Sequence, residues 1–457
     1  MAQTLHCDLC VIGAGAGGLT LAAGASQMGA SVVLIERGQM GGECLNTGCV
    51  PSKALLTAAA RGDSYSAAYE HVQRTIAEIA PQDSRQRFEG LGVRVIAASA
   101  RFTGARTVSA GDFEIRARRY VVATGSTPVI PPLAGIDDVA LLTNETLFTA
   151  RPEPSHLLVL GGGPVGVEMT QAFRRLGARV SLVEELDLLP RDDPELVAVI
   201  RDRLLGEGIA LYERSKAVRV APEGGAIRLT CAGAGGEVEL TGSHLLVAAG
   251  RAANFAGLGL DAAGVATEGG AILLDRRLRT TNRRVFAVGD VAGPYRFTHM
   301  AAYQAGIVLR NTVFRLPAKA NYRAVPWVTY SDPELAHVGL GEEAARRSGV
   351  KFHILRHPFA ENDRAVAAGL TAGLIKVVVT PGGRILGASI AGAGAGELIH
   401  VWSLAVSKRL KVSAMAQTIT PYPTLSEISA RAAGSYYAAK LFSPRTKRIV
   451  RFLQRLG

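Results

Sequence analysis

The sequence predicts an α/β protein in which two domains of one design, each built on a parallel sheet, precede a smaller α+β domain. Three observations lead to this fold. A glycine-rich strand–turn–helix–strand pattern occurs twice, each copy ends at an acidic residue, and the pattern later gives way to a hairpin and long helices. A chain of 457 residues has room for about three domains, so these parts account for its whole length.

The two copies of the pattern match element by element. The first is predicted to contain a buried strand over His6–Ile12, a tight turn over Gly13–Gly18, a helix over Leu19–Met28 and a strand over Ser31–Ile35 that ends at Glu36. The second copy, whose first glycine lies 148 residues after Gly13, comprises Leu157–Leu160, Gly161–Gly166, Val167–Leu176 and Arg179–Val183, ending at Glu184. Each acid follows the first glycine of its own turn by 23 residues. Glycines in such a turn bring a pyrophosphate onto the helix N-terminus while the acid accepts hydrogen bonds from a ribose, so we predict two Rossmann-like dinucleotide-binding domains.

The pattern changes towards the C-terminal end. Val285–Asp290 is predicted to be a short buried strand that ends in Gly-Asp, and a helix starts near Phe297. Strands around Gly373–Val379 and Arg384–Ile390 are joined by Pro381–Gly383, which indicates a hairpin. The predicted division is 1–148, 149–275, 276–321 and 322–457, the third segment completing the first nucleotide site.

Composition and charge exclude several classes of protein. Apolar residues make up 48% and charged residues 20% of the chain, as in folded globular proteins rather than disordered or polytopic membrane chains. The net charge of +12 could indicate a nucleic-acid partner, but seven basic residues and no acid follow Ala430, which leaves only +5 for the other 430 residues. Five cysteines do not make a secreted disulfide framework and no cleavable leader is seen, so we expect a protein of the reducing cytoplasm.

The excess charge belongs to a tail with helical periodicity. Ile449, Phe452, Leu453 and Leu456 recur at the spacing of one helix face. The basic residues of the tail are Arg431, Lys440, Arg445, Lys447, Arg448, Arg451 and Arg455. A basic amphipathic helix can lie on anionic lipid, which would make the protein peripheral at the membrane. The other interpretation is a helix that packs its apolar stripe on its own domain.

The most informative run is Gly41–Lys53, GGECLNTGCVPSK, directly after the first glycine unit. Cys44 and Cys49 are five residues apart, a spacing that puts side chains on different faces of a regular helix. Only a local distortion, assisted by Gly48 and Pro51, lets them close a disulfide. The run therefore predicts a paired, reactive use. The cysteines without a predicted reactive role are Cys7, Cys10 and Cys231.

This run resembles the redox-active segment of the flavoprotein disulfide reductases, the family of dihydrolipoamide dehydrogenase, glutathione reductase and mercuric reductase. The resemblance covers nearly the whole chain. The matching motifs, in the family's order, are the two glycine turns, Cys-x4-Cys-Val-Pro-Ser-Lys, Ala123–Ser126, Ala249–Arg251, Val288–Asp290 and Pro423–Glu427.

The resemblance implies a bound FAD, a pyridine nucleotide and no resident metal. Lys53 would lie near the flavin and pair with Glu168, Asp290 would hold the ribityl chain, Cys49 would contact the flavin, and Cys44 would exchange with substrate. The catalytic residues implied are Cys44, Cys49, Lys53, Glu168, Tyr422 and Glu427. The cofactor-binding residues implied are Gly13, Gly15, Gly18, Glu36, Arg37, Gly42, Lys53, Gly104, Thr124, Gly125, Ser126, Gly161, Gly163, Gly166, Glu184, Gly250, Arg251, Gly289, Asp290, His299, Met300 and Ala301.

The residues after Glu184 bear on the choice of coenzyme. Glu185, Leu186 and Asp187 follow it, and no arginine is available there for a 2′-phosphate. An acid at this point hydrogen-bonds free ribose hydroxyls and repels a phosphate, so NADH is favoured over NADPH. The alternative is that Glu184 is a solvated strand end.

The sequence departs from the family at the substrate end. Disulfide reductases of the dihydrolipoamide and glutathione type carry a histidine before Pro-Thr-x-Ser-Glu, contributed across the dimer, where this chain has Tyr422. A phenol cannot take up a proton at neutral pH as imidazole does. Mercuric reductases resemble this pattern in placing a tyrosine near the metal, but their terminal cysteine pair is absent here, since no cysteine follows Cys231.

The resulting hypothesis is a homodimeric oxidoreductase that passes electrons from NAD(P)H through FAD to the Cys44–Cys49 disulfide. The final acceptor would be a small-molecule or protein disulfide, a soft metal ion or another acceptor. In the dimer, Pro421–Glu427 of one chain would face Cys44 of the other. The alternative is a flavin-bound, redox-sensing or partner-binding dithiol switch with little turnover.

Overall fold

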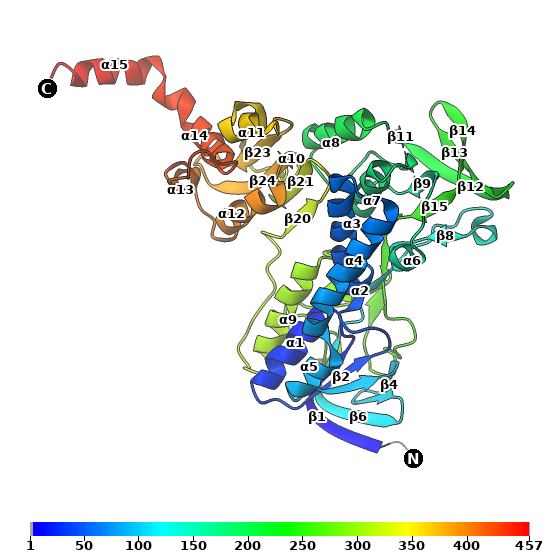
Figure 1. Ribbon diagram of the computed structural model, residues 1–457. Coiled ribbons are helices and arrows are strands. Elements are labelled where there is room, and N and C mark those ends of the chain that lie inside the picture. The colour runs from blue at the N-terminus through cyan, green and yellow to red at the C-terminus, as the bar shows by residue number, and fades with distance from the viewer. Residues whose placement is uncertain (1–2, 457) are drawn as a thin grey trace. The chain divides into compact units, whose positions relative to one another are not determined.

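The computed structural model describes residues 3–456 (Figure 1). Contacts within the chain divide it into two compact units. The first unit comprises the described residues up to Gly161 together with 172–183 and 216–321. The second comprises 162–171, 184–215 and the described residues from Tyr322 onwards. The four-part division predicted above remains a prediction.

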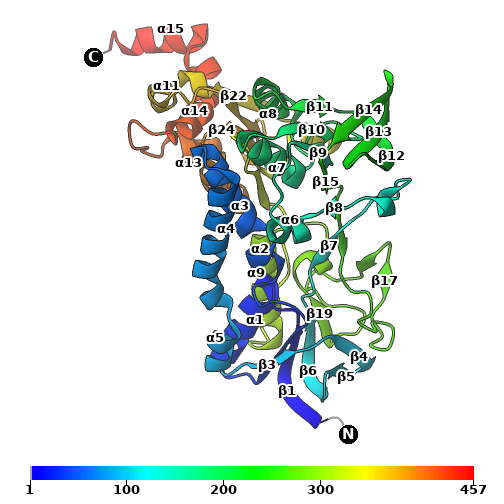
Figure 2. The ribbon, with the colours of Figure 1, turned by 45° about the vertical axis from the view of Figure 1, so that its right-hand side comes forward.

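A seven-stranded sheet forms the base of the first unit, in the order β3–β2–β1–β6–β5–β4 with β19 beside β6 (Figure 2). Its strands are β1 (Gln3–Ile12), β2 (Val32–Glu36), β3 (Arg94–Ala97), β4 (Ala100–Gly104), β5 (Thr107–Ala110), β6 (Phe113–Val122) and β19 (Val285–Ala287). β1, β2, β3, β6 and β19 run parallel, so their carboxyl ends share one edge, where an open α/β sheet binds ligands.

Helices of the first unit pack closely through small residues. α1 (Ala16–Gln27) lies along α9 (Thr298–Thr312), and a Cβ built on Gly24 would stand 3.0 Å from the Leu309 side chain. α3 (Cys49–Arg61) likewise lies along α4 (Tyr65–Ile79) (Figure 2). The remaining helices of this unit are α2 (Gly42–Asn46), α5 (Arg85–Gly90), α6 (Asn144–Ala150) and the 3-10 turns η1 (Ala80–Asp83), η2 (Ile136–Asp138) and η3 (Gly289–Ala292).

The second glycine motif follows a second parallel sheet. Its strands in the first unit are ordered β10–β9–β15–β8, and Leu157–Leu160 are buried in β9, as expected of a strand covered on both faces. The bounds are β8 (Leu141–Leu142), β9 (His156–Leu160), β10 (Arg179–Val183) and β15 (His244–Val247). An antiparallel sheet, β12 (Ser215–Glu223), β13 (Ala226–Gly233) and β14 (Gly236–Gly242), belongs to the same region. Shorter strands are β7 (Ser126–Pro128), β11 (Ala210–Tyr212), β16 (Arg251–Ala253), β17 (Thr267–Glu268) and β18 (Ala271–Ile272).

The second unit is built on an antiparallel sheet in the order β20–β21–β24–β23–β22. Its strands are β20 (Pro326–Thr329), β21 (Glu334–Gly339), β22 (His353–Pro358), β23 (Leu374–Val379) and β24 (Ile385–Gly392). Its helices are α8 (Pro194–Gly206), α10 (Glu342–Arg347), η4 (Phe359–Glu361), α11 (Asp363–Ala368), α12 (Ala395–Ser407), α13 (Val412–Ala416), α14 (Glu427–Leu441) and α15 (Pro444–Leu453). Trp402, Phe359 and Ile428 lie in its core. The hairpin predicted at Pro381–Gly383 is confirmed by the pairing of β23 with β24.

A buried lysine holds the 184–215 segment to this sheet. Lys376 Nζ lies 2.7 Å from Asp193 Oδ2, 2.9 Å from Glu195 Oε2 and 2.7 Å from Glu342 Oε2. Burial opposes the charge on Lys376, but the three carboxylates outweigh it and raise the pKa of the lysine. Removing one partner from such a cluster would leave an uncompensated buried charge, so the ion cluster joins the start of α8 firmly to β23 and α10.

The predicted fold class is confirmed: parallel α/β sheets occur with an α+β C-terminal region. The boundaries differ slightly, since α1 begins at Ala16 rather than Leu19 and α7 (Pro164–Arg175) begins at Pro164 rather than Val167. Both helices start inside the glycine motif, because its small residues fit a first helical turn, and in the second motif Pro164 suits the first helical position. In the described part of the chain, no helix is both long and apolar enough to cross a membrane.

Candidate active site

The inner side of the first glycine turn has no room for side chains, whereas its outer side faces open space. Gly13 has a φ of +108°, and a Cβ there would lie 2.4 Å from the Ala123 carbonyl oxygen. A Cβ on Gly18 would lie 1.9 Å from the Gly13 carbonyl oxygen. Around a Cβ on Gly15, no atom of the described chain comes within 4 Å. The backbone at the start of α1 therefore forms a cradle that fits a pyrophosphate.

The second turn repeats this construction. Gly161 has a φ of +116°, and a Cβ there would lie 2.5 Å from the Ala248 carbonyl oxygen. A Cβ on Gly163, like one on Gly15, would meet no described atom within 4 Å. The two motifs therefore match in the geometry of their backbones as well as in sequence.

Each predicted acid is anchored to its own turn. Glu36 accepts hydrogen bonds from Ala14 N at 2.6 Å and Gly38 N at 2.7 Å. Glu184 accepts them from Gly162 N at 2.6 Å and Leu186 N at 2.8 Å. Each carboxylate oxygen keeps a lone pair for a further donor, such as a ribose hydroxyl. Glu184 is therefore positioned at its turn rather than loose at a strand end.

Asp290 completes the carboxyl edge of the first sheet. It lies in η3, directly after β19, and its Oδ2 accepts a hydrogen bond from Ser126 Oγ at 2.6 Å. Arg251 Nε donates to the same Ser126 hydroxyl at 2.7 Å. Three predicted cofactor residues from distant segments thus meet at one place. This polar cluster, the open cradle at Gly15 and the anchored Glu36 fit the polar parts of FAD.

The redox segment starts directly on the first glycine turn. Gly42 has a φ of +60°, and a Cβ there would lie 2.7 Å from the Gly15 Cα. Cys44 lies in α2 and Cys49 begins α3, with Gly48 in a non-helical conformation between them. The predicted local distortion is confirmed, because two short helices replace one regular helix and bring the two sulfurs together.

Thr298 binds both sulfur atoms and was missed in the sequence. Its hydroxyl donates to Cys44 Sγ at 3.1 Å and lies 3.4 Å from Cys49 Sγ. Cys44 is half-buried and Cys49 is exposed. The Cys49 sulfur and burial together raise the pKa of Cys44, whereas the Thr298 hydroxyl lowers it. The net effect is a raised pKa for the Cys44 thiol in the reduced pair.

Glu43 is a second residue that the sequence did not single out. Arg251 Nη2 donates to Glu43 Oε2, and Asn144 Nδ2 donates to Oε1 at 2.9 Å. Burial raises the pKa of Glu43 to about 7, although Arg251 opposes the shift. Through Arg251 and Ser126, the residue beside Cys44 is thus linked to Asp290. In the sequence, the feature that points to Glu43 is its position next to Cys44. That position does not determine the direction of its carboxylate.

For the predicted Lys53–Glu168 pair, the structure describes the surroundings of each residue separately. Lys53 is half-buried in α3. Glu168 is buried in α7 and accepts a hydrogen bond from Tyr330 N at 3.0 Å. Their pairing remains a prediction.

His299 is exposed, with its ring stacked on Phe297, while its neighbours Met300 and Ala301 are buried.

Tyr422 is largely exposed in the second unit. Its hydroxyl donates to Asp363 Oδ2 at 2.9 Å, and this bond raises the pKa of the phenol. Glu427 is the first residue of α14, and its Oε1 lies 4.0 Å from Arg431 Nη2. Because its pKa is raised, this phenol ionises even less readily than free tyrosine, so little phenolate is present to take up a proton at neutral pH.

The remaining cysteines are unreactive by environment. Cys10 and Cys231 are buried, and burial raises the pKa of Cys231 to about 11 and that of Cys7 to about 12. Within residues 3–456, no group of three or more His, Cys, Asp or Glu side chains is placed to hold a metal ion.

Comparison with protein families agrees with this geometry. Residues 7–305 match the pyridine nucleotide-disulphide oxidoreductase family, and residues 325–433 match its dimerisation domain. The chain belongs to this family. Proteins of the family are FAD-dependent and use a pyridine nucleotide, and the dimerisation domain supports a homodimer.

Relatives in the family include different reductases. The chain is 36% identical to a mercuric reductase of Streptomyces lividans, over 94% of this chain and 96% of that protein. It is also 36% identical to a dihydrolipoyl dehydrogenase of Thermus scotoductus, over 92% and 95%. Among solved structures, the Cu(II) complex of the HOCl-induced flavoprotein disulfide reductase RclA of Escherichia coli has a TM-score of 0.87 at 28% identity, covering 93% of this chain and 99% of RclA.

A test of Thr298 follows from its contact with both sulfurs. Thr298→Val keeps the side-chain shape but removes the hydroxyl that lowers the pKa of Cys44. One hydrogen bond to a charged group contributes about 1.5–3 kcal/mol, so Cys44 alkylation by iodoacetamide should shift upward by about 1–2 pH units. Mass spectrometry of the Cys44 peptide in the reduced protein measures the profile. Thr298→Ser is the control that should stay near wild type; a valine profile equal to wild type contradicts the role.

Proposed function

We propose that this protein uses NADH to reduce a soft metal ion through FAD and the Cys44–Cys49 pair. The observation that carries the proposal is the placement of the two thiols side by side under the Thr298 hydroxyl. When bound, FAD supplies the relay between nicotinamide and the cysteines. NADH gives two electrons, the disulfide takes them up with protons as a dithiol, and it re-forms when the acceptor takes the electrons. Paired thiolates are preferred ligands of soft metal ions.

The environment of Tyr422 favours a metal ion over a disulfide. Thiol–disulfide exchange requires Cys44 to lose its proton, and general acid–base help is worth about 10²–10⁴ in rate. Tyr422 is bonded to Asp363, and its raised pKa makes it a poor base at neutral pH. A soft metal ion displaces the thiol proton by binding the sulfur itself. The mercuric reductase of Streptomyces lividans and the Cu(II)-bound RclA structure support the same acceptor class.

The finer roles belong to the same proposal. Cys49 would be the flavin-contacting thiol and Cys44 the exchanging thiol, with Lys53 paired to Glu168 near the flavin. Glu427 and Tyr422 would face Cys44 of the partner subunit. We place the activity in a reducing cytoplasm, where a dithiol is maintained.

A second candidate function is a redox-sensing switch with little turnover. The specific observation in its favour is that the Tyr422 hydroxyl donates to Asp363, while burial and the Cys49 sulfur raise the pKa of Cys44. Such a protein would form and break its disulfide slowly and signal through a bound partner.

Steady-state NADH oxidation with a panel of acceptors tests the proposal. We expect Hg(II) and Cu(II) to give turnover well above the oxygen background, and lipoamide and oxidised glutathione to give little. Cys44→Ser should reduce metal-dependent turnover to background, whereas Cys231→Ser, which changes a buried thiol, should not. Faster turnover with a disulfide would make the acceptor assignment wrong, and background rates with every acceptor would favour the switch.

Two substitutions distinguish a functional role of Tyr422 from simple packing. Tyr422→His restores a group that titrates near pH 6–7 and should raise kcat/KM for lipoamide by up to about 10²–10⁴. Tyr422→Phe should lower metal-ion reduction while NADH-to-flavin transfer, followed by stopped flow, stays unchanged. Equal kcat/KM values for wild type and both variants with every acceptor would show that Tyr422 only packs.

Coenzyme choice tests Glu184. Wild type should prefer NADH by kcat/KM, and Glu184→Ala should lower NADH use roughly 10–100-fold, the equivalent of lost hydrogen bonds to a charged group, while easing the penalty against NADPH. Glu237→Ala, an exposed acid on β14, is the control. A wild-type preference for NADPH would rule out the ribose role of Glu184.

A further inference from the structure

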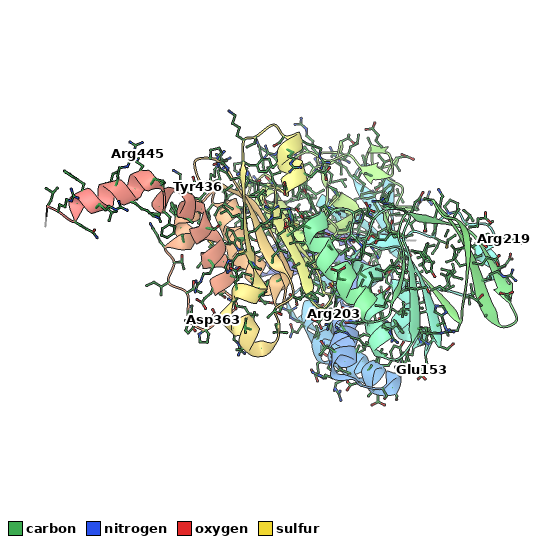
Figure 3. The ribbon with its side chains drawn as sticks, turned by 90° about the horizontal axis from the view of Figure 1, so that it is seen from above. Glu153, Arg203, Arg219, Asp363, Tyr436 and Arg445 are labelled. Atoms are coloured by element: carbon green, nitrogen blue, oxygen red, sulfur yellow. The ribbon has the colours of Figure 1, made fainter. Side chains whose placement is uncertain are left out.

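The C-terminal helix α15 (Pro444–Leu453) has a defined start but no core of its own. Ser443 caps it by accepting a hydrogen bond from Thr446 N, and Pro444 occupies the first turn. None of its ten residues is buried. In Figures 1 and 3 the helix projects beyond α14 away from the sheet of the second unit, and its side chains, Arg445 among them, stand clear of other elements. The interpretation that the tail packs on its own domain is therefore wrong for this chain.

The apolar side chains of the tail are left uncovered. Each of them is between 45% and 71% exposed: Leu441, Phe442, Ile449, Val450, Phe452, Leu453 and Leu456. At about 100° per residue, Ile449, Val450, Phe452 and Leu453 fall on one side of α15, and Leu456 follows in the turn after it. A continuous apolar stripe of this kind marks a surface that another body covers.

The opposite side of the same helix carries only positive charge. Lys447, Arg448 and Arg451 fall there by the same spacing, and Arg455 follows on that side in the turn after the helix. Arg445, in the first turn, falls on the apolar side, and no acid follows Glu427 in the chain. None of these five cations has an ion pair within the part of the chain that the structure describes. The polar face therefore lacks an anionic partner.

We propose that α15, with Leu441 and Phe442 before it, lies in the interfacial layer of an anionic lipid bilayer. A cationic face opposite exposed Phe, Ile, Val and Leu side chains matches lipid phosphates above and acyl chains below. A ten-residue helix is about 15 Å long against about 30 Å of hydrocarbon, so it lies on the membrane rather than across it.

Charge argues against a second copy of the chain as the occupant. The residues before the tail carry a net +5, so another copy of the chain has no net negative charge to attract the cationic helix. An anionic bilayer neutralises the helix and covers its apolar stripe at once. The inference is independent of the acceptor proposed above, because no tail residue belongs to the active site.

Co-sedimentation of the full-length holoenzyme with vesicles tests the inference. Binding to vesicles of phosphatidylcholine and phosphatidylglycerol should exceed binding to phosphatidylcholine alone by at least tenfold in partition coefficient, and should fall as salt is raised. Both Arg448→Glu/Arg451→Glu/Arg455→Glu and Phe452→Ser/Leu453→Ser should reduce it at least tenfold with NADH oxidation unchanged.

A matched control separates the helix from net charge. Lys319→Glu/Lys351→Glu/Lys411→Glu changes the same charge at exposed sites outside the tail and should leave vesicle binding within twofold of wild type. Equal losses in the two triple variants would overturn the proposal in favour of unspecific charge attraction. It is also overturned if wild type ignores both kinds of vesicle, or if the Phe452→Ser/Leu453→Ser variant changes the dimer to a monomer in light scattering, which would make the stripe an interface between copies.

Discussion

The active site depends on a contact between backbones that leaves no room for a single Cβ atom. The end of β6 presses on Gly13, the Gly13 carbonyl presses on Gly18, and the redox segment presses on Gly15 through Gly42. These contacts bring the start of α1, the carboxyl edge of the sheet and the first cysteine helix to one point. The chemistry of the sulfurs can then reach a cofactor whose phosphates the same turn would hold. Any side chain at Gly13, Gly18 or Gly42 would push these segments apart.

The two glycine units share their construction but differ in what surrounds them. In each, the first glycine packs against the backbone at the end of a neighbouring strand. The acid accepts a hydrogen bond from the backbone N–H of the residue after that glycine. Only the first is followed by the cysteine segment and by Asp290 at the same sheet edge. The fold of the two units is thus repeated, and the elements added after each unit distinguish them.

Proton handling in this protein is decided by side chains from separate parts of the chain. Around the sulfurs, Thr298 supplies a hydroxyl and Glu43 a carboxyl with a pKa raised by burial to about 7. At the end of the chain, Tyr422 is tied to Asp363 rather than offering an imidazole. If these roles are as proposed, metal binding, in which the ion displaces the thiol proton, depends less on a base than thiol–disulfide exchange does.

The sequence by itself determined the repeat, the parallel sheets and the reactive pair, because glycine spacing, apolar periodicity and Cys-x4-Cys are local patterns whose geometry follows from backbone sterics. It also indicated that the tail is an amphipathic helix. Only the tertiary structure decided that Thr298 and Glu43 belong to the site, since they reach it through partners up to 254 residues away. The tertiary structure likewise decided that α15 finds no cover on its own domain. Contacts between distant segments depend on how the sheets and helices pack, and no local pattern in a single sequence records that packing.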